Sequence, residues 1–370
     1  MRTREAEPMQ PPDSTRQRIR ILLVEDSPTE IYLLRKLFQH APDLEIAGVA
    51  QNGREALDML PGLRPDIICT DYHMPVMGGL EFILKAKKLS TCPIMVLSVA
   101  VQAHQKDNIF KLLSAGAVAV VAKPTGTMAG ITPDEGRELF DMIREIARSH
   151  SHKTTRPTDA PVPMTPISQG GDGPRTLKPD PRGVTLVAIG ASTGGPQVLA
   201  QLFAKLPATY PVPIVCVQHI SSGFLGGLVS WLEHECKLAV KIAEPGDTAR
   251  PGHLYFAPDG MDLKISGRGI FMLEPGGAPN RHCPSIDSLF FSVAKEFGAK
   301  ALGILLTGMG RDGAAGLKAM IDAGATTIAQ NEETSVIFGM PGAAITLGAA
   351  RFVLSTEDIY RTLARLKVRG

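Results

Sequence analysis

The chain has 370 residues, more than a usual single domain, so two domains with separate cores are expected. Lys and Arg number 39 against 37 Asp and Glu, and a formal charge of +2 argues against nucleic acid or an acidic membrane surface as partner. Five scattered cysteines without a C-x-x-C pair favour reduced thiols in a cytoplasmic protein over disulfides or zinc. No apolar run approaches the roughly 20 residues of a spanning helix, so no membrane insertion is expected.

The amino-terminal part alternates short β-like runs with amphipathic helical runs. Residues 1–18 are charged and proline-bearing and are expected to be disordered. In the first helical run, Ile31, Leu34 and Leu37 share one face, while Glu30 is expected on the outside. The pattern predicts a doubly wound α/β domain over residues 19–148, with a parallel sheet covered by helices on both faces. The expected strands are residues 20–24, 44–50, 66–70, 94–98 and 117–122.

Polar residues gather where these strands end. They are Glu25, Asp26, Asp71, Ser98 and Lys123. Carboxylates at one sheet edge repel each other unless a cation is near, and oxygen ligands suit Mg²⁺, for which Glu25, Asp26 and Asp71 are the expected ligands. Asp71 is then a candidate phosphoryl acceptor, with Lys123 neutralising charge and Ser98 hydrogen-bonding the product. The alternative is a solvated rim of loops.

The same residues resemble a two-component receiver domain. The resemblance is carried by Val24-Glu25-Asp26-Ser27, Thr70-Asp71-Tyr72-His73-Met74-Pro75, Gly78-Gly79, Ser98 and Lys123-Pro124. It implies a flavodoxin-like fold, phosphorylation of Asp71 from a chemotaxis histidine kinase, Mg²⁺ held partly by Glu25 and Asp26, and Ser98 as the phosphate-sensing hydroxyl. Receivers often place an aromatic residue three positions before the lysine. Val120 stands there, which argues against an aromatic-rotamer relay.

A linker is expected over residues 149–183, after a last receiver helix over residues 133–148. Residues 154–181 show no sustained periodicity and contain several prolines and the run Gly170-Gly171-Asp172-Gly173. Such a segment cannot build a packed core, so a mobile or loosely docked tether with a spacing role is expected.

The carboxyl-terminal domain, residues 184–370, is expected to be a mostly parallel α/β domain. Expected strands are residues 185–189, 213–218, 253–256 and 301–307, with β-like segments at 263–265 and 326–329. Ser192, His219 and Asp312 each follow one of these strands, and the carboxyl ends of parallel strands line one crevice. The spacing G-x-S-x-G at Ser192 suits a nucleophile on a tight turn. His219 is then the base, Asp312 its orienting acid, and the amides of Thr193 and Met309 are candidate oxyanion donors.

Several alternatives stay open from the residues alone. The serine turn is equally compatible with a plain connection between strand and helix. His234, His253 and His282 compete with His219, and Asp259, Asp262 and Asp287 compete with Asp312. A nucleotide-binding module fits less well because neither G-x-G-x-x-G nor G-K-[ST] occurs. A DNA-binding response regulator also fits less well, because the carboxyl half is near neutral and shows no helix-turn-helix pattern.

The carboxyl-terminal motifs resemble the catalytic domain of CheB-type chemotaxis methylesterases. They are Ile189-Gly-Ala-Ser-Thr-Gly-Gly-Pro196, Val217-Gln-His219, Pro284-Ser-Ile-Asp287, Leu306-Thr-Gly-Met-Gly-Arg-Asp-Gly313 and Phe338-Gly-Met-Pro341. The resemblance implies a protein-glutamate methylesterase and protein-glutamine glutaminase that acts on cytoplasmic domains of methyl-accepting chemotaxis receptors, without a cofactor for the ester step. It assigns the triad to Ser192, His219 and Asp312 and the oxyanion surroundings to Thr193 and Met309. It also implies that the unphosphorylated receiver covers the esterase site. Cys283 and Gly342 depart from the family pattern and bear on substrate docking or domain contacts.

Overall fold

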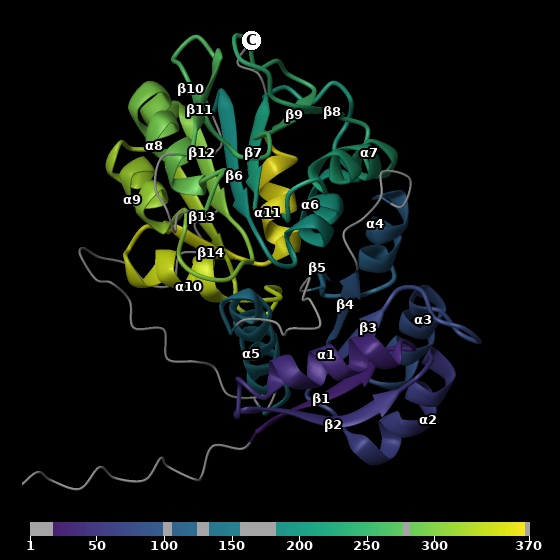
Figure 1. The fold of residues 1–370 in the computed structure, drawn as a ribbon. Helices are drawn as coiled ribbons and strands as arrows, with labels where there is room; N and C mark the ends of the chain where they lie inside the picture. The colour runs from purple at the N-terminus through teal and green to yellow at the C-terminus, as the bar shows by residue number, and fades with distance from the viewer. Residues whose placement is uncertain (1–17, 99–105, 124–132, 156–182, 277–281, 367–370) are drawn as a thin grey trace, which may run out of the picture.

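The computed structural model describes residues 18–98, 106–123, 133–155, 183–276 and 282–366. Residues 1–17 of the segment expected to be disordered, and most of the expected linker, lie outside these ranges. Two α/β domains follow one another along the chain, one below the other in Figure 1. Within the described ranges, no helix has both the length and the apolar character that a bilayer crossing requires.

The amino-terminal domain is a five-stranded parallel sheet in the order β2-β1-β3-β4-β5, which is the flavodoxin-like order. The predicted fold class is therefore confirmed, and β2 and β4 have the predicted bounds. The strands are β1 Ile19–Val24, β2 Leu44–Ala50, β3 Ile67–Asp71, β4 Ile94–Ser98 and β5 Ala119–Ala122. The helices are α1 Pro28–Phe38, α2 Gly53–Leu63, α3 Gly79–Leu89, α4 Lys106–Ser114 and α5 Pro133–Thr155.

Helix α5 extends beyond the end predicted from the sequence. It reaches Thr155, whereas residue 148 was expected to end it. Residues 149–155 are polar, which suggested a linker, but they contain neither glycine nor proline, and the next proline is Pro157. Nothing in these residues breaks a helix before that proline, so the helix continues.

The carboxyl-terminal domain has a seven-stranded, wholly parallel sheet in the order β14-β13-β12-β6-β7-β9-β8 and a separate antiparallel hairpin β10-β11. The sheet strands are β6 Leu186–Ala191, β7 Ile214–Gln218, β8 Ala239–Ile242, β9 His253–Phe256, β12 Ala301–Leu305, β13 Thr326–Gln330 and β14 Phe352–Leu354. The hairpin strands are β10 Met261–Ile265 and β11 Phe271–Pro275. The helices are α6 Gly195–Phe203, α7 Leu225–Glu235, α8 Ile286–Phe297, α9 Ala314–Asp322, α10 Gly339–Thr346 and α11 Thr356–Leu363, with a 3₁₀ turn at Gly298–Lys300.

Three strands were missing from the sequence prediction. β8 and β14 are the two edges of the large sheet, and β11 belongs to the hairpin. Each is short, and most of its residues are exposed or only half-buried. Without a continuous buried run, such strands give little apolar signal in the sequence.

The chain leaves the central strand β6 in both directions. β7 lies on one side of β6 and β12 on the other. A reversal of this kind opens a crevice outside the carboxyl ends of the strands, which is where α/β sheets usually bind their ligands. The loops after β6, β7 and β12 therefore face one another.

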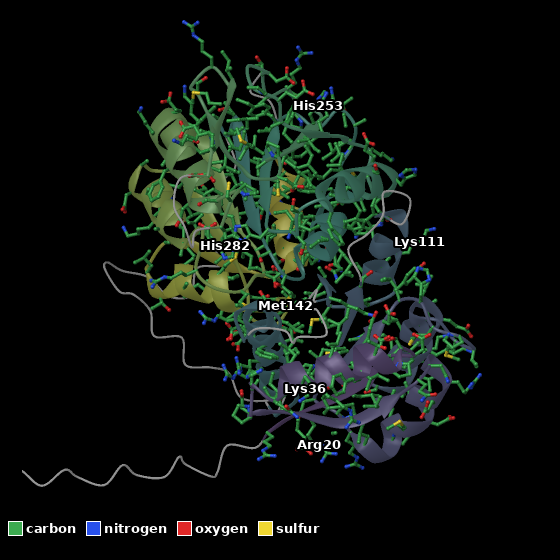
Figure 2. All side chains as sticks on the ribbon, in the orientation of Figure 1. Arg20, Lys36, Lys111, Met142, His253 and His282 are labelled. Carbon is green, nitrogen blue, oxygen red and sulfur yellow. The ribbon has the colours of Figure 1, made fainter. Side chains whose placement is uncertain are left out.

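The amino-terminal domain packs against the carboxyl-terminal domain near this crevice. Helix α4 lies beside α7 (Figure 1), and the rings of Phe110 and Trp231 stack with centroids 5.4 Å apart at 17°. The Gln197 side chain donates a 2.7 Å hydrogen bond to the carbonyl of Ala117 at the start of the β5 region. Met142 of α5 lies between the two domains (Figure 2). The α4-β5-α5 side of the amino-terminal domain thus covers the carboxyl ends of the carboxyl-terminal sheet.

Candidate active site

Ser192 lies on the turn between β6 and α6. Its amide donates a 3.0 Å hydrogen bond to the carbonyl of Thr307, and its own carbonyl accepts a 2.8 Å bond from the amide of Gly195. Gly194 has φ +79°, a conformation that strains residues with a Cβ, and a Cβ there would also meet the side chain of Val336. The glycines around the serine are therefore required by the turn itself. Ser192 is buried.

His219 and Asp312 come together across the sheet from the loops after β7 and β12. The backbone amide of His219 donates a 2.9 Å hydrogen bond to the carbonyl of Ala191, which places the histidine beside the Ser192 turn. Its Nε2 lies 2.9 Å from Oδ2 of Asp312. Both side chains are about nine-tenths buried, so this contact is largely shielded from water.

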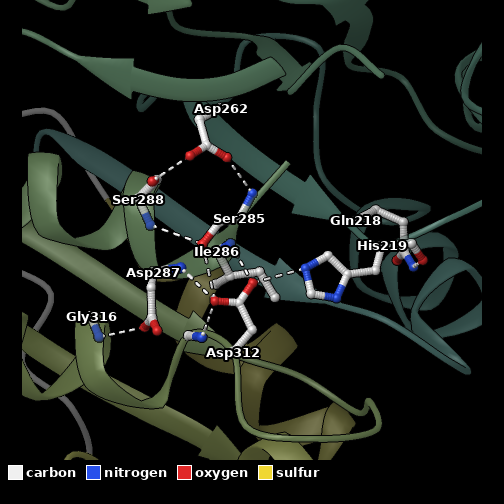
Figure 3. A network of polar contacts seen from close by, with 10 residues as sticks. Gln218, His219, Asp262, Ser285, Ile286, Asp287, Ser288, Asp312 and Gly316 are labelled. Atoms are coloured by element: carbon white, nitrogen blue, oxygen red, sulfur yellow. Dashed lines mark hydrogen bonds and ion pairs between the residues drawn. The ribbon is translucent and has the colours of Figure 1, made fainter. Parts of the chain in front are cut away.

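The carboxylate of Asp312, in the loop after β12, lies against the amino terminus of α8, where several hydrogen-bond donors surround it (Figure 3). It accepts hydrogen bonds from the amides of Ile286 at 2.8 Å, Asp287 at 3.1 Å and Gly313 at 3.0 Å, and from the Ser285 hydroxyl at 3.1 Å. Burial alone would raise the pKa of Asp312, but His219 and the helix amides together lower it to about 2. The carboxylate is therefore ionised and well oriented toward His219.

A second carboxylate holds the turn that carries these donors. Asp262, which is buried, accepts from the amide of Ser285 at 2.8 Å and from the hydroxyl of Ser288 at 2.8 Å (Figure 3). Ser285 in turn caps α8. Asp262 appeared in the sequence only as a rival for the triad acid, and its supporting role depends on the α8 turn and β10 meeting in space.

The other candidates lie in different surroundings. The Nδ1 atoms of His234 and His253 lie 2.7 Å and 2.9 Å from the carbonyls of Ser230 and Pro251. Asp259 accepts from the amide of Gly223 at 2.8 Å. Asp287 accepts from the amide of Gly316 at 2.6 Å, and burial raises its pKa.

His282 is the exception among the alternatives, because it does reach the site. Its ring stacks on that of His219, with centroids 4.4 Å apart at 21°. Its position in a glycine- and proline-rich loop gave no sign of this contact. The structure thus places His282 on the ring of His219 and leaves Asp312 as the acid that His219 contacts.

A cavity of about 460 Å³ lies beside His219 and His282 and is lined by both domains. Ser192, Thr193, His219 and Met309 line it from the catalytic side. The receiver contributes the apolar side chains of Phe110, Leu113, Val118, Val120 and Met142. Val120, where receivers often have an aromatic residue, therefore faces the catalytic domain, and Cys283 lines the same cavity.

A larger cavity of about 580 Å³ lies at the opposite ends of β6 and β7 and is lined by neither Ser192 nor His219.

The receiver has its own polar cluster at the carboxyl edge of its sheet. Lys123 Nζ lies 3.1 Å from Asp71 and 2.8 Å from Glu25, and it also contacts Glu30. Glu30 was predicted to point outward. That prediction is wrong, because the first turn of α1 brings its carboxylate over the end of β5. Ser98, also at this edge, is buried.

The cluster fits a divalent cation. Oxygen atoms of Glu25, Asp26 and Asp71 all lie within 4.8 Å of one another. Burial raises the pKa of Glu25 to about 7 although Lys123 donates a hydrogen bond to it. Several carboxyl groups thus face a single lysine, burial disfavours the charged form of Glu25 when no further cation is near, and hard oxygen ligands with one exposed side suit Mg²⁺.

The fold and the two polar centres define a two-domain response regulator with an α/β output domain. Sequence comparison agrees: a response regulator receiver domain model matches residues 21–131, and a CheB methylesterase model matches residues 187–363. The chain belongs to the CheB methylesterase family, the receiver-linked protein-glutamate methylesterases/protein-glutamine glutaminases.

Two relatives align along nearly the whole chain, and a solved structure aligns with its carboxyl-terminal half. The protein-glutamate methylesterase/protein-glutamine glutaminase 1 of Syntrophus aciditrophicus (strain SB) is 40% identical over 348 residues, covering 94% of this chain and 98% of its own. The protein-glutamate methylesterase/protein-glutamine glutaminase of Nitrosospira multiformis is 37% identical, and the alignment covers 94% of this chain and 97% of that protein. The crystal structure of the Thermotoga maritima CheB methylesterase catalytic domain aligns with 50% of this chain and 99% of its own, at 37% identity and a TM-score of 0.48.

Proposed function

We propose that the chain hydrolyses glutamyl methyl esters, and deamidates glutamines, on methyl-accepting chemotaxis receptors under control of phosphorylation at Asp71. Family membership supports the reaction and the substrate class. The observation that carries the assignment of residues is the contact of His219 with Asp312 beside a cavity that Ser192 and His219 both line, at the carboxyl ends of three adjacent parallel strands. Acting on receptor cytoplasmic domains and receiving phosphate from a histidine kinase, the protein works in the cytoplasm.

In this mechanism, Ser192 attacks the γ-carbonyl of the substrate while His219 takes its proton. Nε2 of His219 faces Asp312, and Nδ1 is buried with no hydrogen-bond partner among the described residues, so Nδ1 is the nitrogen assigned to the proton transfer. The imidazolium then protonates the leaving methanol, or ammonia from a glutamine. Water hydrolyses the acyl-enzyme by the same route in reverse, and Asp312 stabilises the imidazolium in both halves.

The negative oxygen that forms during attack needs donors already in place. The amides of Thr193, next to the nucleophile, and Met309, in the loop after β12, are assigned to this task because both residues line the cavity with Ser192. Removing one oxyanion donor typically lowers kcat by about 10²- to 10³-fold.

The receiver supplies the switch. Glu25, Asp26 and Asp71 would hold Mg²⁺, which offsets negative charge when a phosphoryl group reaches Asp71. Lys123 contacts Asp71 directly and Ser98 ends the neighbouring strand. Because the receiver covers the Ser192 cavity, substrate entry requires the domains to separate. Phosphorylation adds charge and acceptors at the strand ends next to this interface, which shifts the docking equilibrium.

The test is methanol release from methylated receptor cytoplasmic fragments. The intact protein and Ser192→Ala are each assayed with and without acetyl phosphate and Mg²⁺. We expect release that depends on Ser192 and rises with the phosphodonor. Equal release from folded Ser192→Ala would contradict the assigned nucleophile, and no release from several receptors would contradict the substrate class.

A further inference from the structure

Gln218 is a buried polar residue at the end of β7 that the mechanism above does not use. It is only 3% exposed and precedes His219. Its Nε2 donates two hydrogen bonds, one to the carbonyl of Ser192 and one to the carbonyl of His219, both at 2.8 Å. One side-chain amide thus connects the backbone of the assigned nucleophile to the backbone of the assigned base.

The orientation of this amide is fixed by its surroundings. A flipped amide would point Oε1 at the same two carbonyl oxygens, and neither side could donate. The Oε1 atom instead lies against Gly195, where an added Cβ would come within 2.2 Å of it. Within the described part of the chain, Oε1 has no hydrogen-bond partner. The protein therefore keeps a buried unpartnered oxygen in order to place both N–H groups.

The bond to Ser192 also fixes the direction of the next amide. In a planar trans peptide, the C=O of Ser192 and the N–H of Thr193 point in opposite directions. The amides of Gln218 and Gly195 both hold the Ser192 carbonyl on the side of β7 and α6. The Thr193 N–H is consequently held pointing away from them, and Thr193 is one of the two assigned oxyanion donors.

We propose that Gln218 is a positioning residue for the hydrolysis, which holds the Thr193 oxyanion donor and the His219 base in a fixed relation to Ser192. The inference rests on the proposed function only for the roles of these three residues. We call the two hydrogen bonds of Gln218 the clamp. Loss of this clamp leaves receptor binding intact but lets the Ser192–Thr193 peptide rotate. The consequence is a lower kcat rather than a higher KM.

The test compares three full-length variants with the wild type, all with acetyl phosphate and Mg²⁺. Gln218→Met keeps the volume and removes the donor. Gly195→Ala keeps glutamine at position 218, but the added Cβ pushes the Gln218 side chain out of its place. Tyr210→Phe is the matched control, because it removes a buried side-chain bond to the carbonyl of Leu363 at 3.1 Å, at the other end of the same sheet. The readouts are kcat and KM for methanol release and the rate of Ser192 labelling by a fluorophosphonate, each per folded molecule.

For Gln218→Met and Gly195→Ala we expect kcat and the labelling rate to fall by about tenfold or more, with KM changed less than about twofold. Tyr210→Phe should change only thermal stability. Labelling and kcat at wild-type levels in both site variants, or a rise in KM alone, would overturn the inference. Rapid, Gln218-dependent labelling of a wild type that releases no methanol would overturn the proposed substrate and keep the inference.

Discussion

The stack between Phe110 of the receiver and Trp231 of the catalytic domain makes the docking of the receiver over the Ser192 cavity measurable. We call the docked arrangement the covered state. The two rings lie 5.4 Å apart and nearly parallel, and Trp231 is only partly buried on α7. An aromatic pair contributes about 0.5–1.5 kcal/mol beyond the burial of its area. Trp231→Ala weakens docking by at least this amount, so the ratio of open to covered molecules rises by about 2- to 10-fold.

The assay is methanol release before and after addition of acetyl phosphate and Mg²⁺. Trp231→Ala should raise the basal rate by the same factor and leave the phosphorylated rate unchanged, so that the stimulation shrinks. Trp231→Phe keeps a ring over Phe110 and should stay near the wild type. Phe291→Ala is the matched control, because Phe291 is a 48% exposed aromatic residue of helix α8, and this helix lies away from the receiver in Figure 1. An unchanged basal rate in folded Trp231→Ala, with full stimulation, would refute the reasoning.

Three further predictions concern the two polar centres. Asp71→Asn should keep the basal methanol release and lose stimulation by acetyl phosphate, and retained stimulation would show that another residue accepts the phosphoryl group. The pKa of Asp312 is lowered from 3.8 to about 2, so its ionisation stabilises the fold above pH 4, and about 2 kcal/mol of unfolding free energy should be lost as pH falls from about 4 to 2. Denaturant titrations between about pH 4 and about pH 2 give the free energy of unfolding of the wild type and of Asp312→Asn. An equal loss of unfolding free energy in both proteins over this range would contradict the prediction. Ser285→Ala removes the helix cap and one donor to Asp312, so it should lower the thermal midpoint and lower kcat by several-fold, and an unchanged kcat would show that the helix amides alone orient Asp312.

Much of the fold followed from local patterns in the sequence. The alternation of apolar runs and amphipathic helices predicted both parallel sheets, and strands such as β2, β4 and β9 have the predicted bounds. Buried parallel strands are detectable because most of their residues form an apolar run. The failures were at exposed edges, where β8 and β14 lack such a run, and at α5, where polar residues without a helix breaker continued the helix.

The candidate site followed from a rule about strand ends. Ser192, His219 and Asp312 were selected because each follows a strand predicted to be parallel, and the structure places their loops around one cavity. The same rule ranked His219 and Asp312 above the rival histidines and acids, but strand-end position says nothing about which side chains touch. His282 illustrates the limit, because its stack on His219 links a loop to a residue 63 positions earlier in the numbering.

By itself, the sequence determined the two domains, their parallel sheets and the residue types gathered at the strand ends, because these depend on periodicity and on turns a few residues long. Only the tertiary structure decided how those residues are supported and covered. The donors around Asp312, the clamp of Gln218 on two backbone carbonyls and the apolar face of the receiver over Ser192 all join segments distant in sequence. Such contacts depend on the distances and directions between packed elements, which local sequence patterns do not contain.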